Sequence, residues 1–292
     1  MEAHARLDRV FKQVVGPGDF AISPNRNCLR GCSCERARSW ASVSASFSAG
    51  FGGDDDYTIH KLRPNARNYT FDASQPAAVR VKSGDVIEVQ CLDASDGWLQ
   101  PTGTGATTAH YAKRRHTPEI MARFPGNPNC EPVYVEGAEP GDNLHVELLE
   151  LRSETWGWTG VRRGFGLLAG DQLFPDDRLQ IWQLHPDTRA PCEFGDTGIK
   201  VPYRPFCGCM GVAPPPGEVW EEGQEPGVVT IGPPNIAGGN IDTKHLVEGS
   251  TVRLPVFVPG ALFSLGDGHA AQGDGEVCGS AIECHMWVRW PV

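Results

Sequence analysis

The sequence predicts a mainly β fold of the α+β class, in which many short strands are joined by turns and helices are few. Glycine and proline are both abundant, with 35 and 24 copies among the 292 residues, and these residue types favour turns over long helices. Several segments alternate apolar and polar side chains, which is typical of strands with one buried face. A chain of this length can also bury a sizeable core.

The alternating segments give the positions of the predicted strands. Residues 78–93 alternate on both sides of Ser83-Gly84-Asp85, which predicts a hairpin. A second hairpin is predicted from residues 134–136 and 144–151, joined by a turn at 139–142. Further strands are predicted at 179–184, 251–258 and 282–290, and short helices at 7–14 and 118–124.

Composition argues against several classes of protein. The formal net charge of −10 does not suit a general nucleic-acid binder, because neutralising phosphates requires patches of Lys and Arg. The basic cluster at 113–115 is too short to reverse this and is interpreted as a surface loop. No stretch reaches the ~20 apolar residues that span a bilayer, and the N-terminus lacks the apolar core of a secretory signal. The ten cysteines form no matched clusters, so we interpret most of them as reduced thiols in a cytoplasmic protein.

Residues 1–56 differ from the rest of the chain and are predicted to be a poorly ordered N-terminal extension. Residues 20–53 are rich in Ser, Arg, Gly and Cys, and Glu35 is their only acid. Such a composition buries little apolar surface. An organellar transit segment is the alternative, although Glu2 and Asp8 argue against it.

The stretch from Phe257 to Glu283 is predicted to carry the chemistry. Two tetrads, Gly266-Asp-Gly-His269 and Gly273-Asp-Gly-Glu276, place acids and an imidazole among glycines. Glycine allows a loop to adopt left-handed or strained conformations. A stretch that only connected two strands would not need so many ionisable groups beside apolar runs. We therefore expect it to bind a cation or to move a proton.

A series of longer motifs extends over most of the chain. They lie at residues 81–85, 92–93, 132–142, 211–214, 238–242, 249–251, 254–264 and 266–279. Together these motifs resemble the acetamidase/formamidase family. The resemblance implies a metal-associated hydrolase that releases ammonia from a short-chain amide, formamide or acetamide. It also implies a two-layer, β-sandwich-like domain with few short helices over residues 57–292, and a homo-oligomer with a dimer as the expected state.

Two features depart from the family pattern. Family members commonly carry a His directly before Gly-Gly-Asn, where this chain has Ala237. They also continue with further sheet past the equivalent of Trp290, so the domain is expected to be C-terminally shortened. The alternative function that follows is a non-catalytic relative, acting as a binding or oligomerisation module on the same scaffold.

A divalent metal is the expected cofactor. Asp267 and His269 are two residues apart, so they would share one face of an extended segment or clasp an ion on a glycine turn. Positions 271 and 273 lack the oxygen ligands of an EF-hand, so further ligands must come from elsewhere, and Asp93 and Asp242 are the best candidates. Turn capping is the alternative for Asp93 and for the Asp267–His269 pair, and helix N-capping for Asp242. Zn²⁺ is expected if the ligands are few, and Ca²⁺ if oxygens are many.

Glutamates are the candidates for proton transfer. An apolar wall from Val277 is expected to raise the pKa of Glu276, and Glu283 is a second candidate. Glu136 stands between apolar residues, where an unpaired carboxylate would be costly. Salt bridging is the alternative role for Glu276, and metal ligation is the alternative to a general-base role for Glu136. The predicted catalytic set is therefore Glu276 or Glu136 for protons and Asn240, with neighbouring backbone amides, for the carbonyl oxygen.

Overall fold

The chain divides into two units at Asp56 and Tyr57, and the computed structural model describes residues 57–99, 127–168, 175–220 and 224–292 of the second. Every regular element in these ranges is a strand, which confirms the mainly β prediction. The short helices predicted at 7–14 and 118–124, and the predicted extension 1–56, lie outside the described residues. Within the described ranges, no helix is long and apolar enough to cross a membrane.

The strands are short, as the frequent turn residues predict. In order along the chain they are β1 (Ile59–Lys61), β2 (Thr70–Asp72), β3 (Val79–Val81), β4 (Val86–Cys91), β5 (Val133–Val135), β6 (Asn143–Glu147), β7 (Glu150–Ser153), β8 (Trp156–Val161), β9 (Arg178–Gln183), β10 (Cys192–Glu193), β11 (Lys200–Val201), β12 (Phe206–Gly211), β13 (Val228–Thr230), β14 (Gly238–Asn240), β15 (Thr251–Pro255), β16 (Ser264–His269) and β17 (Met286–Pro291).

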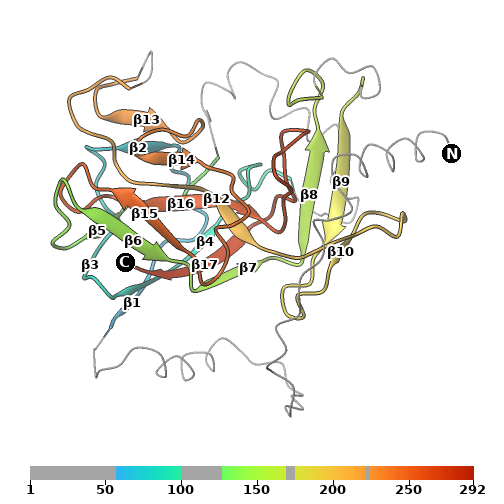
Figure 1. Ribbon diagram of the computed structural model, residues 1–292, viewed down its shortest axis with the longest axis horizontal. Coiled ribbons are helices and arrows are strands. Elements are labelled where there is room, and N and C mark those ends of the chain that lie inside the picture. Colours follow the sequence, from blue (N-terminus) through green and yellow to red (C-terminus); the bar gives the residue numbers. More distant parts are fainter. Residues whose placement is uncertain (1–56, 100–126, 169–174, 221–223) are drawn as a thin grey trace, which may run out of the picture. The chain divides into compact units, whose positions relative to one another are not determined.

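These strands form several small sheets (Figure 1). The largest has the order β1-β4-β17-β7, and a second has the order β14-β12-β16. The remaining strands pair two by two, as β2 with β13, β3 with β5, β6 with β15, β8 with β9 and β10 with β11. The pairing of strands into small sheets does not test the predicted two-layer sandwich, which stays a prediction.

Both predicted hairpins are wrong in their pairing, although their strands exist. In the first, β3 pairs in parallel with β5, while β4 pairs with β1 and β17. In the second, β6 pairs with β15. Alternation in the sequence reports which face of a strand is buried, but the partner is chosen by long-range packing, which no local turn reveals.

Asp85 explains why the first turn does not close a hairpin. Its Oδ1 accepts a hydrogen bond from the Thr58 N–H at 2.9 Å, and its Oδ2 accepts one from the Lys82 N–H at 2.9 Å. The same oxygen lies 3.0 Å from His60 Nε2. Asp85 therefore connects the turn to Thr58, the residue before β1, and β1 pairs in parallel with β4. Burial acts to raise the pKa of Asp85, but the hydrogen bonds from Lys82, Thr58 and His60 outweigh it and lower the pKa.

Replacing Asp85 with Asn should lower the free energy of unfolding by about 1–3 kcal/mol, because the charged acceptor of three hydrogen bonds is lost. The lowered pKa means that this contribution is present at neutral pH, and that it disappears as the pH falls from the ordinary value of 3.8 through the lowered one. Urea denaturation at neutral and acidic pH measures both effects. Asp142→Asn is the matched control, because Asp142 ends the other Gly-Asp turn but is exposed and accepts from Glu139 N. If Asp85→Asn and Asp142→Asn lower the free energy of unfolding equally, this role of Asp85 is contradicted.

The core lies where β12 and β16 pack against the largest sheet. All six residues of β12 and all six of β16 are buried. Around them, the largest fully buried side chains include Phe206, Phe263, Leu265 and Trp290. The seven described cysteines are free thiols, and six of them are buried, which confirms the prediction of reduced thiols for this part of the chain. Any ionisable residue on β16 is thus held inside apolar packing.

Candidate active site

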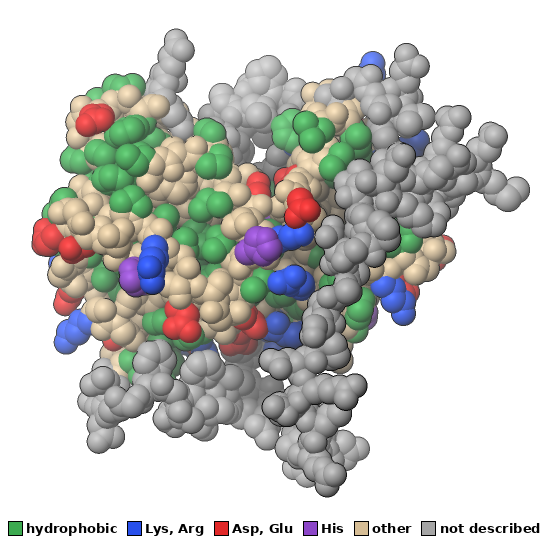
Figure 2. All heavy atoms as spheres, in the orientation of Figure 1, with side chains coloured by type: hydrophobic (Ala, Val, Ile, Leu, Met, Phe, Trp, Pro, Cys, Tyr) green, Lys and Arg blue, Asp and Glu red, His purple; other side chains and the backbone are tan. Residues whose placement is uncertain are grey.

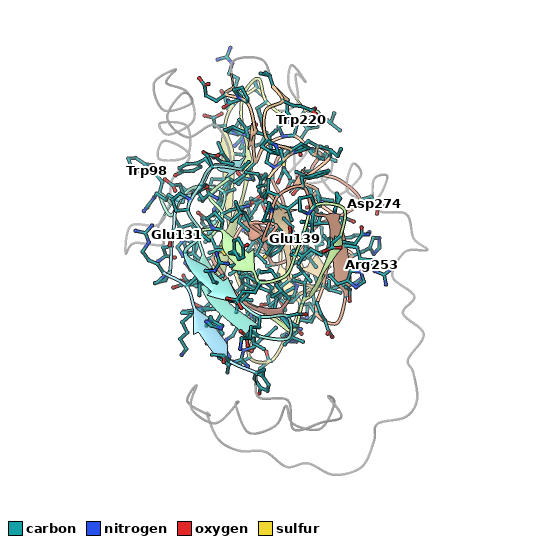
Figure 3. All side chains as sticks on the ribbon, turned by 90° about the vertical axis from the view of Figure 1, so that its left-hand side faces the viewer. Trp98, Glu131, Glu139, Trp220, Arg253 and Asp274 are labelled. Atoms are coloured by element: carbon teal, nitrogen blue, oxygen red, sulfur yellow. The ribbon has the colours of Figure 1, made fainter. Side chains whose placement is uncertain are left out.

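Three ionisable residues of the glycine-rich stretch are buried, whereas most charged side chains lie at the surface. Figure 2 shows acidic and basic side chains interspersed over one face, and Figure 3 labels exposed examples such as Glu139 and Arg253. In contrast, Asp267, His269 and Glu283 retain 1%, 1% and 2% of their surface exposed. Charged residues are rarely buried unless they are paired or bind an ion, so these three mark a candidate functional site.

Asp267 and His269 lie on β16, so the tetrad that carries them is a core strand and not a loop. Its glycines are required by close packing, because a Cβ at Gly266 would lie 2.4 Å from the Pro128 carbonyl oxygen, and one at Gly268 would meet β17. Asp267 adopts a left-handed φ of 59°, which is uncommon for a residue with a side chain. The result is that Asp267 Oδ1 lies 3.4 Å from His269 Nε2.

Gly208 forms one wall of the site. It lies on β12 between Cys207 and Cys209, which pair with Gly268 and Gly266 of β16. A Cβ at this glycine would lie 2.4 Å from Asp242 Oδ1, 2.6 Å from Asp267 Oδ2 and 2.9 Å from His269 Cε1. The three functional groups therefore face one small space, which exists only because residue 208 has no side chain.

Asp242 reaches this space from the segment after β14. Its N–H and that of Ile241 both donate to the Gly208 carbonyl oxygen, at 3.1 and 2.9 Å. Asn240 Nδ2 donates to Asp242 Oδ2 at 2.6 Å, and Asp242 itself has a left-handed φ of 45°. No helix follows Asp242 in the described chain, so the N-capping alternative is wrong.

Two glutamates complete the cluster. The backbone of Glu283 exchanges two hydrogen bonds with Trp158, and its Oε1 accepts from the Ala281 N–H at 2.9 Å. Its Oε2 lies 3.2 Å from His269 Nε2. Glu276 Oε1 lies 3.7 Å from the same nitrogen. The carboxylates of Asp267, Glu276 and Glu283 thus surround one imidazole nitrogen.

Burial and repulsion between carboxylates dominate the electrostatics. Burial, followed by the charge of Asp267, raises the pKa of Asp242 to about 7. Burial, followed by the charge of Glu283, raises the pKa of Glu276 to about 9, the direction expected from the sequence. Burial alone would lower the pKa of His269, but Glu283 and Asp267 raise it well above its ordinary value. The site therefore holds more negative charge than its single imidazole can balance.

The cluster fits a divalent cation. Within the described residues, no Lys or Arg forms an ion pair with its carboxylates, and several buried atoms lack any hydrogen-bond partner: Asp242 Oδ1, Asp267 Oδ1, His269 Nδ1, Glu276 Oε1 and Glu283 Oε2. One ligand atom each from Asp242, Asp267 and His269 lies within 4.8 Å of the other two, and the same holds for His269, Glu276 and Glu283. Carboxylate oxygens and imidazole nitrogens are ligands that Zn²⁺ accepts, and Ca²⁺ accepts the oxygens.

Asp93 does not belong to either of these two groups of ligand atoms. It is fully buried, but its Oδ1 accepts hydrogen bonds from the Ser95 hydroxyl at 2.7 Å and from the Ser95 and Gly97 N–H groups at 3.1 and 3.0 Å. Its Oδ2 accepts from Trp158 Nε1 at 2.7 Å. Both oxygens are thus occupied. The turn-capping alternative describes Asp93 correctly, and we do not retain it as a ligand.

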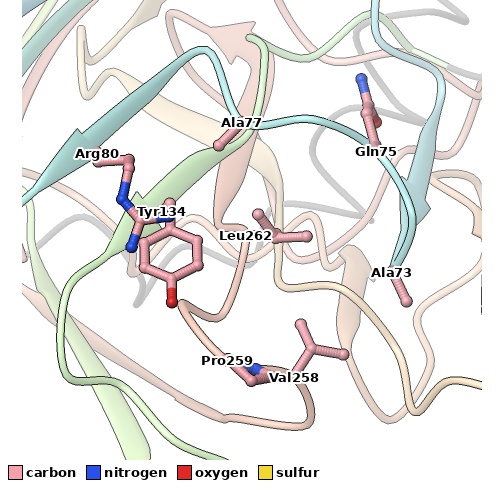
Figure 4. Close-up of a pocket in the computed structure, with 8 residues that line it drawn as sticks. All are labelled: Ala73, Gln75, Ala77, Arg80, Tyr134, Val258, Pro259 and Leu262. Carbon is pink, nitrogen blue, oxygen red and sulfur yellow. The ribbon is translucent and has the colours of Figure 1, made fainter.

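Glu136 also lies apart from the acid cluster. It was expected to be buried, but its side chain is 47% exposed, and Oε1 lies 3.9 Å from Arg80 Nε. The guanidinium of Arg80 stacks on Tyr134 at the edge of a pocket of about 330 Å³ (Figure 4). None of the residues that line this pocket belongs to the acid cluster. Because the Glu136 side chain is about half exposed and lies outside the cluster, the sequence-based role in proton transfer is not supported.

Sequence reasoning missed Gly208 and Cys209. The motif Cys207-Gly-Cys209 has no second cysteine cluster that could complete a zinc site with it, and in the structure its glycine forms a wall of the acid cluster. The Cys209 Sγ lies 2.8 Å from Asn240 Oδ1 and 3.5 Å from Asp267 Oδ2. A glycine inside an apolar strand often marks a close approach of another group. The glycine between two cysteines was therefore the feature of the sequence that could have indicated Gly208.

Ala237, which stands where the family pattern has His, is fully buried in the apolar core. Its N–H donates to Asn235 Oδ1 at 2.8 Å. The acid cluster therefore assembles without an imidazole at this position.

The chain matches the family model described as "Acetamidase/Formamidase family" over residues 63–221 and 215–292. It is 31% identical to an acetamidase of Mycolicibacterium smegmatis over 264 residues, which cover 71% of this chain and 61% of that protein. It is 28% identical to a formamidase of Methylophilus methylotrophus, with 71% and 59% covered. The chain thus spans about three fifths of the length of these relatives.

A solved structure has a similar fold. The protein is described as a predicted acetamidase/formamidase from the thermophile Thermoanaerobacter tengcongensis, and the likeness has a TM-score of 0.65 with 28% sequence identity. It covers 81% of this chain and 69% of the other.

Proposed function

This chain belongs to the acetamidase/formamidase family, and we propose that its acid cluster hydrolyses a short-chain aliphatic amide, formamide or acetamide, to the carboxylic acid and ammonia. The observation that carries the proposal is the convergence of Asp242, Asp267, Glu276 and Glu283 on one buried imidazole. Four carboxylates that share a single imidazole, with no Lys or Arg partner among the described residues, are costly to bury for structural reasons alone. The matching relatives named acetamidase and formamidase support amide hydrolysis as the use of this cluster.

A divalent cation would be held by Asp242, Asp267 and His269, whose side chains border the space beside Gly208 and offer ligand atoms within 4.8 Å of one another. When bound, it would polarise the amide carbonyl and ease deprotonation of a water molecule. His269 has to be neutral to act as a ligand. Its raised pKa favours the imidazolium form, so cation binding would release a proton from this ring.

Glu276 is the proposed proton donor. In hydrolysis, a water oxygen attacks the carbonyl carbon, the C–N bond breaks, and the departing nitrogen gains a proton to leave as ammonia. In the cluster without a bound cation, burial and then the charge of Glu283 raise the pKa of Glu276 to about 9, so its carboxyl group holds a proton at neutral pH. Its side chain is 19% exposed, so solvent reaches it, whereas the side chains of Asp267 and Glu283 are buried. A carboxylic acid in this position can deliver the proton that the nitrogen needs.

Asn240 is the proposed donor to the carbonyl oxygen, with a restriction that the sequence did not reveal. A side-chain amide has two N–H donors. One of those on Asn240 Nδ2 is used by Asp242 Oδ2 at 2.6 Å. Only the second N–H can therefore stabilise negative charge on a substrate oxygen.

Replacing Glu276 with Gln should lower kcat for ammonia release from formamide or acetamide by about 10²-fold or more, because the amide cannot donate an acidic proton. Ammonia is measured directly, with each amide tested separately. Asp274→Asn is the matched control, since Asp274 lies two residues earlier on the same segment but is 86% exposed and pairs with Lys244. Its rate should stay near that of the unmodified protein.

The alternative function predicts a different result. A non-catalytic binding module would retain a bound cation but release no ammonia from either amide. A bound cation without ammonia release in the unmodified protein would contradict the proposed hydrolysis, but it would agree with the proposed cation site.

A further inference from the structure

Cys209 lies behind the acid cluster and has no role in the reaction proposed above. We propose that its thiol is a positioning residue, which holds the Asn240 side-chain amide in the orientation that aligns Asp242. This inference rests on the proposed function of the acid cluster, but its geometric part can be tested without activity.

The orientation of the Asn240 amide follows from its two neighbours. Asn240 Nδ2 lies 2.6 Å from Asp242 Oδ2, and a carboxylate oxygen accepts a hydrogen bond from an amide nitrogen but would repel an amide oxygen. The amide oxygen therefore faces the other way. There it lies 2.8 Å from Cys209 Sγ, whose S–H is the donor that this contact requires.

Little else can replace the thiol as a donor at this place. Cys209 is fully buried and packs with Phe71, Val229 and Ile231 in a small apolar cluster. Asn127 Nδ2 also reaches Asn240 Oδ1, but at 3.5 Å it is a weak second contact. The Cys209 sulfur lies 3.5 Å from Asp267 Oδ2, so the shorter contact to Asn240 takes its single proton.

The hydrogen-bond chain from Cys209 through Asn240 ends on a residue that needs support. Asp242 has a left-handed φ of 45°, and its Oδ1 faces Gly208 without a hydrogen-bond partner. Holding Oδ2 fixes the carboxylate plane, so Oδ1 points into the cluster. Groups behind a ligand commonly set its orientation in this way.

Two substitutions at Cys209 separate the hydrogen bond from simple packing. Cys209→Ala removes the donor, and zinc affinity measured by titration calorimetry should fall about 10–100-fold, the usual cost of losing such a supporting group. Cys209→Ser restores an O–H donor and should return zinc affinity and kcat close to the unmodified values. Cys192→Ala is the control for a lost buried sulfur, because Cys192 lies in the apolar core on β10.

Crystal structures of Cys209→Ala and Cys209→Ser give the second readout. The contact between Asn240 Nδ2 and Asp242 Oδ2 should be broken in the alanine variant and kept in the serine variant. An alanine variant that keeps both this contact and its zinc affinity would overturn the inference, and so would a serine variant that behaves like alanine. If the unmodified protein neither binds zinc nor releases ammonia, the proposed function fails, and the position of Asn240 in the two variants still decides the geometric claim.

Discussion

Replacing Gly208 with Ala is expected to abolish ammonia release, a loss of well over ~10²-fold, while the protein remains folded. The added Cβ would lie 2.4 Å from Asp242 Oδ1 and 2.6 Å from Asp267 Oδ2, far inside van der Waals contact. Both carboxylates must then move by about 1 Å, and misplacing reacting groups by that distance can cost ~10²-fold each. The backbone of Gly208 does not need a positive φ, so alanine is compatible with the strand itself.

The matched control for Gly208→Ala is Gly232→Ala. A Cβ at Gly232 would have one neighbour within 4 Å, the Thr230 hydroxyl at 3.8 Å, and this glycine also has no positive φ. Circular dichroism and thermal unfolding monitor the fold of both variants. Full activity of Gly208→Ala would mean that the space beside this glycine is not where the reaction takes place.

Replacing Asp267 with Asn is the second change with a large expected effect. Asparagine has nearly the same shape and tolerates the left-handed backbone that Asp267 adopts. The substitution therefore removes a charge with little change in packing. We expect ammonia release to fall by about 10³-fold, in the range observed when an electrostatic contact to the reacting centre is removed.

The same substitution should change His269 in a defined direction. Asp267 is one of the two carboxylates that raise the pKa of His269, so in the metal-free Asp267→Asn protein this pKa should fall. NMR titration of the imidazole measures the shift. Asp93→Asn is the control, because Asp93 is equally buried but bonds to Ser95, Gly97 and Trp158. An Asp93→Asn protein that loses its activity while remaining folded would restore Asp93 to the site.

Local pattern was sufficient to locate several of the strands, but it could not pair them. The alternating segments correspond to β4, β6, β9, β15 and β17. Their partners lie far away in sequence, as in the ion pair of Arg289 on β17 with Glu88 on β4. Both Gly-Asp turns resemble hairpin turns, yet Asp85 uses its carboxylate to recruit Thr58 instead. Whether such a turn closes a hairpin depends on which distant strand packs beside it.

The candidate site was predictable where its residues belong to one motif. Asp267, His269 and Glu276 lie within a segment of ten residues, and Asp242 belongs to the neighbouring Gly-Gly-Asn motif. Asp93 and Glu136 were chosen for their place at strand ends or among apolar residues, which does not determine where a carboxylate points. Gly208 could not be recognised as a wall of the site, because it lies beside Asp267 and His269 only when β12 pairs with β16.

The buried acid cluster is proposed to be a divalent cation site. X-ray diffraction from crystals grown with zinc, recorded on both sides of the zinc absorption edge, tests it most directly. We expect an anomalous peak about 2.0–2.2 Å from ligand atoms of Asp267 and His269, the distances usual for zinc with oxygen and nitrogen ligands. A peak beside Asp93 and none in the cluster, or no peak at all, would contradict it.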